Sequence, residues 1–109
     1  MSVETNKKVA RLYHDLNPDD IEEILTPDFI GHGSKGLTWN RDSHGEFWRT
    51  PSLKVKDAVH EQVAEGDWVA TRFTRTGTNE GKPVNEDIMN FKRFADGKIA
   101  ELWEVFSSK

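Results

Sequence analysis

Residues 94–104 read FADGKIAELWE, and this stretch decides the fold class. The pair Asp96-Gly97 stands between two runs in which apolar and polar residues alternate, which is the pattern of two antiparallel strands joined by a tight turn. The run before the turn covers residues 88–94, and the run after it covers residues 99–106. The sequence therefore predicts a β-hairpin over residues 88–106.

The chain upstream of this hairpin is also strand-like. Residues 68–76 alternate and are rich in Val, Thr and Phe, and the turn residues 65–67 separate them from an extended run that starts at Leu53 and continues through Val63. Residues 77–83 contain two glycines and a proline, which predicts a loop. The second half of the chain is therefore predicted to be a series of antiparallel strands.

Helical patterns occupy the first half of the chain. An apolar stripe predicts an amphipathic helix that Ser2 or Thr5 caps and that Asn17-Pro18 ends. A second short helix opens at Pro18 and stops at Thr26-Pro27, and a third begins near Thr38 or Asn40. Between the second and third helices lie a very short strand over residues 28–30 and a glycine-rich loop over residues 31–36. Helices segregated from an antiparallel sheet define the α+β class.

Composition excludes several classes of function. The chain has 109 residues, a length that predicts one domain over residues 1–109. Its net charge is −4 and it has no run of Lys or Arg, so we expect no nucleic-acid partner. It has no cysteine, and its four histidines show neither HxH nor HExxH spacing, so we expect no metal and no cofactor. No segment approaches the ~20 apolar residues of a membrane helix and residues 1–16 do not resemble a signal peptide, so the cytoplasm is the default expectation.

Three segments carry a resemblance to a known family. Residues 27–32 (PDFIGH), 64–78 (AEGDWVATRFTRTGT) and 94–104 occur in the order found in SnoaL-like proteins of the nuclear-transport-factor-2-like superfamily, and the chain resembles them over nearly its whole length. The resemblance implies a strongly curved antiparallel sheet packed against three short helices. It also implies a pocket between them for a small apolar molecule.

The resemblance further implies a catalytic carboxylate on the last strand. In polyketide cyclases of this family that residue is an Asp, which moves a proton next to a carbonyl during ring closure, and the matching position here is Glu104. A glutamate can do this work if burial raises its pKa. The other interpretation of Glu104 is a solvent-facing strand residue paired with Lys or Arg.

Two further residues are candidates for the same catalytic site. His32 follows a strand end and could share a proton with Glu104, or it is a loop histidine bonded to backbone. Asn90 could orient a substrate carbonyl, or it is a polar residue at a strand edge. If the hairpin turn carries a glycine bulge, Asn90 lies opposite Leu102 on the face of Glu104; if the turn has two residues, Asn90 leaves that face.

Six apolar residues are predicted to line the pocket, although ordinary core packing explains their positions equally well. They come from the first helix, the third helix and the last hairpin: Tyr13, Trp39, Trp48, Ile88, Leu102 and Phe106. On the opposite face of the sheet, Trp103, Val105, Met89 and Phe91 form a second apolar surface, which predicts a homodimer.

Two functions from different classes fit these residues. One is an enzyme that moves a proton on a small, mostly apolar carbonyl compound. Epoxide hydrolysis fits less well, because it needs several polar groups to position a water. The other function is a non-catalytic ligand-binding or dimerisation module of the same fold. They are distinguished by whether Glu104 is buried and shares a cavity with a second proton-handling group.

Overall fold

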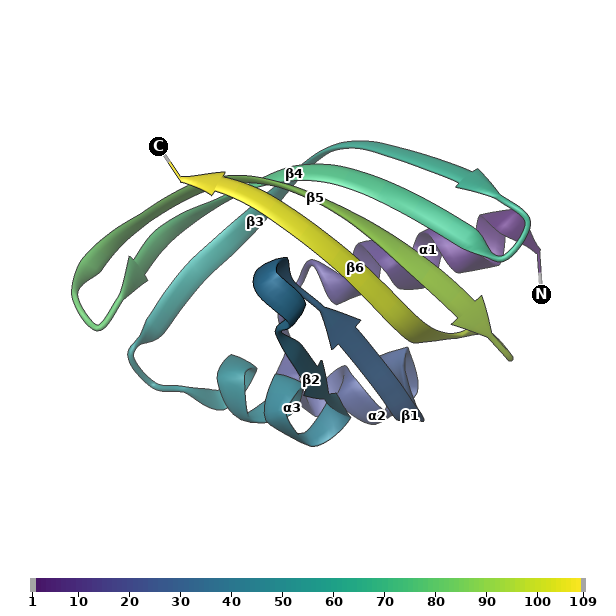
Figure 1. The fold of residues 1–109 in the computed structure, drawn as a ribbon, viewed down its shortest axis with the longest axis horizontal. Coiled ribbons are helices and arrows are strands. Elements are labelled where there is room, and N and C mark those ends of the chain that lie inside the picture. The colour runs from purple at the N-terminus through teal and green to yellow at the C-terminus, as the bar shows by residue number, and fades with distance from the viewer. Residues whose placement is uncertain (1, 109) are drawn as a thin grey trace.

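The computed structural model describes residues 2–108 as an arched sheet with its helices on the concave side (Figure 1). Helix α1 (Val3–Tyr13) lies under strands β3 (Leu53–Glu65) and β4 (Trp68–Asn79). The remaining elements are a 3-10 turn (Pro18–Asp20), α2 (Ile21–Ile24), β1 (Leu25–His32), a second 3-10 turn (Ser34–Gly36), β2 (Thr38–Asn40), α3 (Arg41–Arg49), β5 (Lys82–Ala95) and β6 (Lys98–Ser108). The predicted α+β class, with a curved sheet against three helices, is confirmed.

The six strands form one sheet in the order β2-β1-β6-β5-β4-β3. Strands β3 to β6 make a continuous antiparallel meander, and β1 joins it beside β6 as a parallel neighbour. Apart from that parallel pair, the sheet is antiparallel as predicted. We call the face that α1 covers the inner face and the opposite one the outer face.

The helix boundaries follow from local capping. The Ser2 hydroxyl accepts a hydrogen bond from the Thr5 backbone, so Ser2 caps α1 as predicted. The helix ends at Tyr13, before the predicted stop at Asn17-Pro18, and Leu16 turns the chain with a φ of 56°. Asn40 caps α3 through a reciprocal pair of hydrogen bonds with Ser43, which confirms a start at Asn40.

Two stretches of strand are longer in the structure than the sequence predicted. The loop expected over residues 77–83 is wrong, because β4 and β5 continue through it and only the two residues Glu80 and Gly81, both with positive φ, make the turn. The short strand expected at residues 28–30 extends back to Leu25. Its pairing with β6 is irregular between Leu25 and Ile30, which is where a strand tolerates Pro27 and its missing N–H donor.

The hairpin at Asp96-Gly97 contains a β-bulge that determines which side chains of β6 point to the inner face. Its turn has two residues, with Ala95 opposite Lys98, but Ala100 is an extra residue that shifts the pairing by one. Asn90 therefore lies opposite Glu104, and the predicted pairing with Leu102 is wrong. Asn90 and Glu104 share the inner face, as expected for the bulged alternative. The expectation that a two-residue turn moves Asn90 off this face is wrong, because Ala100 adds a bulge.

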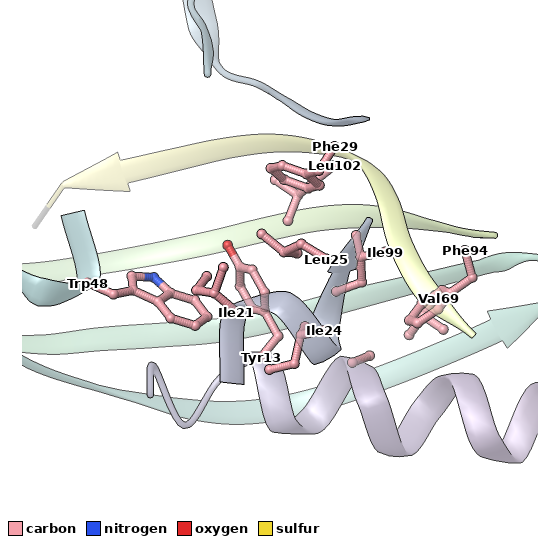
Figure 2. Packing of buried hydrophobic residues seen from close by; sticks show 11 residues of the cluster. Tyr13, Ile21, Ile24, Leu25, Phe29, Trp48, Val69, Phe94, Ile99 and Leu102 are labelled. Carbon is pink, nitrogen blue, oxygen red and sulfur yellow. The ribbon is translucent and has the colours of Figure 1, made fainter. Parts of the chain in front are cut away.

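The hydrophobic core fills the space between the inner face and helices α1 and α2 (Figure 2). Tyr13 reaches up from α1 and packs beside Trp48 of α3 and Leu25 of β1. Leu102 and Ile99 close this core from β6, and both are fully buried. Among the described helices, none is long and apolar enough to cross a membrane.

Candidate functional site

Glu104 stands on the inner face of β6 beside Asn90 of β5. The Asn90 side-chain amide donates to a Glu104 carboxylate oxygen over a long 3.5 Å contact. Burial raises the pKa of Glu104, and the positive charge of Arg75 opposes this shift without cancelling it. The predicted inward direction of Glu104 is thus confirmed, whereas its catalytic role stays a prediction.

A fully buried lysine lies next to this pair. The Lys92 ammonium donates to the Asn90 side-chain oxygen at 2.6 Å and to the Thr71 hydroxyl at 3.0 Å. Its third contact, also 3.0 Å, is with Nε2 of His14. Burial lowers the pKa of Lys92 to about 7, although the negative charges of Glu104 and Asp57 act in the opposite direction. Lys92 is therefore a second proton-handling group, joined to Glu104 through one amide side chain.

From Lys92, the series of hydrogen-bonded side chains continues through His14 to a buried ion pair. His14 Nδ1 lies 2.8 Å from Asp57, and Arg75 binds the same carboxylate with two hydrogen bonds of 2.8 and 3.0 Å. Although burial alone would raise it, the bonds from His14 and Arg75 hold the pKa of Asp57 below its usual value. The ionised carboxylate accepts a hydrogen bond from Nδ1–H, which leaves His14 Nε2 free to accept from Lys92.

We call six of these linked side chains the inner network: Glu104, Asn90, Lys92, His14, Asp57 and Arg75. Its two potential cations balance its two carboxyl groups, which is how buried charge is tolerated. The sequence analysis expected only His32 and Asn90 as polar neighbours of Glu104, and it did not predict Lys92, His14, Asp57 or Arg75 near it. The missed signal was a lysine at an inward position of β5, between Asn90 and Phe94, where alternation calls for an apolar residue.

His32 is not part of this site. Its Nε2 lies 2.9 Å from Glu101, and its ring stacks on Trp103 with the ring centroids 4.7 Å apart. Glu101 and Trp103 are outer-face residues of β6, so the predicted proton exchange between His32 and Glu104 is wrong. The parallel pairing of β1 with β6, which sequence reasoning did not predict, brings His32 opposite Trp103.

The six predicted lining residues fall into two groups. Tyr13, Trp48, Ile88 and Leu102 are buried at the inner face, and Figure 2 shows the Tyr13 hydroxyl pointing from α1 toward the sheet. Phe106 is half exposed near the end of β6. Trp39 lies in β2, where its indole covers Gly31 so closely that a Cβ there would overlap it.

The outer face carries the second apolar surface that alternation predicted. Met89, Phe91, Trp103 and Val105 are each between 39% and 60% exposed on the isolated chain. Trp68 joins them, with its ring centroid 5.6 Å from that of Trp103. We call these five residues the outer patch.

Comparison with known proteins places this geometry in a family. Residues 4–108 match the family model for SnoaL-like polyketide cyclases. An uncharacterised protein of Mycobacterium tuberculosis (strain ATCC 25618 / H37Rv) is 30% identical over 73 residues, which are 64% of this chain but only 58% of that protein. Wild-type IdmH from Streptomyces antibioticus superposes with a TM-score of 0.72 at 20% identity, covering 95% of this chain and 90% of its own.

A second solved structure gives the same result for the fold. An NTF2-like protein of unknown function from Mesorhizobium loti has a TM-score of 0.78 at 16% identity, covering 96% of this chain and 93% of its own. The family match covers nearly the whole described chain. The chain belongs to the SnoaL-like polyketide cyclase family.

Proposed function

We propose that this protein binds a small, mostly apolar carbonyl compound and moves a proton on it, with Glu104 as the general acid/base. One observation carries the proposal: Glu104 has a raised pKa and is linked through Asn90 to the buried Lys92. A carboxylate whose pKa is shifted toward neutrality exchanges protons efficiently near neutral pH. The family description, polyketide cyclase, supports the same class of chemistry.

The proposed step is proton removal next to a carbonyl. Glu104 takes a proton from the adjacent carbon, the C–H electron pair moves into the carbonyl, and an enolate forms. The positive charges of Lys92 and Arg75 stabilise the negative charge that develops. The enolate then takes the proton back at another position, which is isomerisation. Alternatively its carbon attacks a second carbonyl, which closes a ring and leaves an alkoxide that takes the proton from Glu104.

Exchange of the proton next to a carbonyl tests this step without knowledge of the natural substrate. In D₂O, the wild type should speed deuterium uptake into members of a panel of small cyclic and aromatic ketones, followed by proton NMR. Glu104→Gln should lose about 100-fold or more of that rate, the usual contribution of a general base, and should keep or raise the melting temperature. The control is Glu101→Gln, on the outer face of the same strand, which should exchange like the wild type.

Two results would separate this proposal from the alternative. A Glu104 carboxyl carbon that titrates by NMR at or below the ~4.3 of a free glutamate would end the acid/base role. Ketone binding without deuterium uptake would support the non-catalytic ligand-binding module instead.

We also propose that the protein acts in the cytoplasm as a homodimer built on the outer patch. Exposed apolar surfaces of this kind are usually interaction sites. Trp103→Glu places a charge in the middle of the patch, and it should give a monomer in light scattering with an unchanged far-ultraviolet circular dichroism spectrum. A wild type that is monomeric at micromolar concentration would contradict the proposal.

A further inference from the structure

We propose that His44 of α3 is a ligand-binding residue whose Nε2–H donates a hydrogen bond to an uncharged oxygen of the ligand, of the carbonyl class. The inference rests on the proposed function for the kind of molecule bound, and it adds the residue that holds the oxygen. Nothing in the sequence pattern had singled out His44 above the other histidines.

The tautomer of His44 follows from a single contact. The indole Nε1–H of Trp39 lies 2.7 Å from His44 Nδ1, and an indole nitrogen only donates. Nδ1 must therefore be the acceptor, and the neutral ring carries its hydrogen on Nε2. Burial lowers the pKa of His44 to about 3, with the positive charge of Arg75 acting in the same direction, so the ring stays neutral at working pH.

This Nε2–H is a buried donor without an acceptor. Within the part of the chain that the structure describes, no hydrogen-bond partner lies in reach of it, and the residue is only 6% exposed. Aromatic rings surround the His44 imidazole instead. The centroid of that imidazole lies 4.9, 5.4 and 5.6 Å from the ring centroids of Trp48, Tyr13 and Phe29. Buried polar groups are nearly always satisfied, so an orphaned donor beside a candidate site points to an acceptor supplied by a ligand.

The position of His44 fits a ligand that also reaches the inner network. Tyr13 contacts His44 on one side, and Lys92 of the inner network lies 5.0 Å from the centroid of the Tyr13 ring. A flat apolar molecule that parts the packed rings of Tyr13 and Trp48 would present its oxygen to His44. An uncharged donor among aromatic rings compensates a carbonyl oxygen but not a full negative charge, which selects against carboxylate ligands at this point.

Acetophenone labelled with ¹³C at its carbonyl is a suitable probe, with the histidines of the protein labelled with ¹⁵N. Binding should move the His44 Nε2–H signal and the carbonyl carbon signal together and saturably. His44→Phe keeps an aromatic ring and should weaken binding at least tenfold. His60→Phe is the matched control, since His60 is exposed on β3, where its side chain bonds to Thr74, and it should bind like the wild type.

One more variant and one parallel measurement separate loss of binding from loss of folding and from loss of the acid/base role. His44→Gln supplies an amide donor in place of the imidazole and should recover part of the affinity, which covers the case in which His44→Phe fails to fold. Deuterium uptake into the acetophenone methyl group, measured in parallel, reports the acid/base role separately from this binding readout. Equal affinity of His44→Phe and the wild type, an unmoved Nε2–H signal in the complex, or no binding by the wild type would each overturn the assignment.

Discussion

Replacing Asp57 by alanine is expected to remove about 3–5 kcal/mol from the free energy of unfolding, the usual cost of stranding a buried charge. The Asp57 side chain is fully buried, and the side chain of its partner Arg75 is only 10% exposed. Without the carboxylate, the guanidinium keeps its charge but loses two hydrogen bonds, and His14 loses the acceptor for its Nδ1 proton. Chemical denaturation at pH 7 measures the loss.

A matched control lies on the same pair of strands. Glu61 of β3 also pairs with an arginine of β4, Arg72, but these side chains are 65% and 53% exposed. Exposed pairs of this kind contribute about 1 kcal/mol at most, so Glu61→Ala should cost far less than Asp57→Ala. Similar losses for the two variants would contradict the buried ion pair as described.

The stability of the wild type is expected to rise by about 2–3 kcal/mol between pH 7.5 and 9.5, because of Lys92. Its pKa is about 7 in the folded protein and 10.5 in its ordinary state. Between these values the unfolded chain carries a proton on Lys92 that the folded chain lacks. Unfolding therefore takes up a proton, and raising the pH favours the folded state. Below pH 7 both states are protonated, so this slope disappears.

Lys92→Met tests whether Lys92 causes this slope. A methionine fits the volume but does not titrate, so the variant should show a flat stability between pH 7.5 and 9.5 in urea denaturation. Lys56→Met, at an exposed position of β3, should keep the wild-type slope. A slope that survives in Lys92→Met would assign the pH dependence to other groups. His14, with a pKa that burial lowers to about 4, titrates outside this window.

The fold was largely predictable from local patterns, because the signals that define it are short. Alternation over residues 68–76 and 88–106 marked the meander, and Ser2 and Asn40 marked the starts of two helices. The failures lie where local signals mislead. Two glycines and a proline suggested a loop at residues 77–83, although a two-residue turn at Glu80-Gly81 lets both strands continue through it. The parallel pairing of β1 with β6 depends on residues about 70 positions apart and has no local signal.

The site was predicted only in part, for a related reason. Alternation placed Glu104 on the inner face with Leu102 and Phe106. The position of Asn90 was left open between two hairpin registers, and the bulge at Ala100 decides it. The inner network needs side chains from β3, β4, β5 and β6 and from His14, the residue that follows α1, and no single segment shows that Asp57, Arg75 and His14 meet. Lys92 was visible as an inward-facing charge on β5, but a lysine in a strand is more often on the solvent side.

The extra residue Ala100 has a consequence for length variation among related chains. With the two-residue turn at Asp96-Gly97 alone, Glu104 would point to the outer face of the sheet. The extra residue Ala100 shifts the later residues of β6 by one position and returns Glu104 to the inner face. A homologue that gains or loses one residue in this hairpin must make a second change of one residue nearby to keep its carboxylate inside. We therefore expect insertions and deletions between residues 93 and 102 to be inherited in pairs, so that single-residue gaps in future sequence alignments of this region mark chains that have abandoned the inner carboxylate.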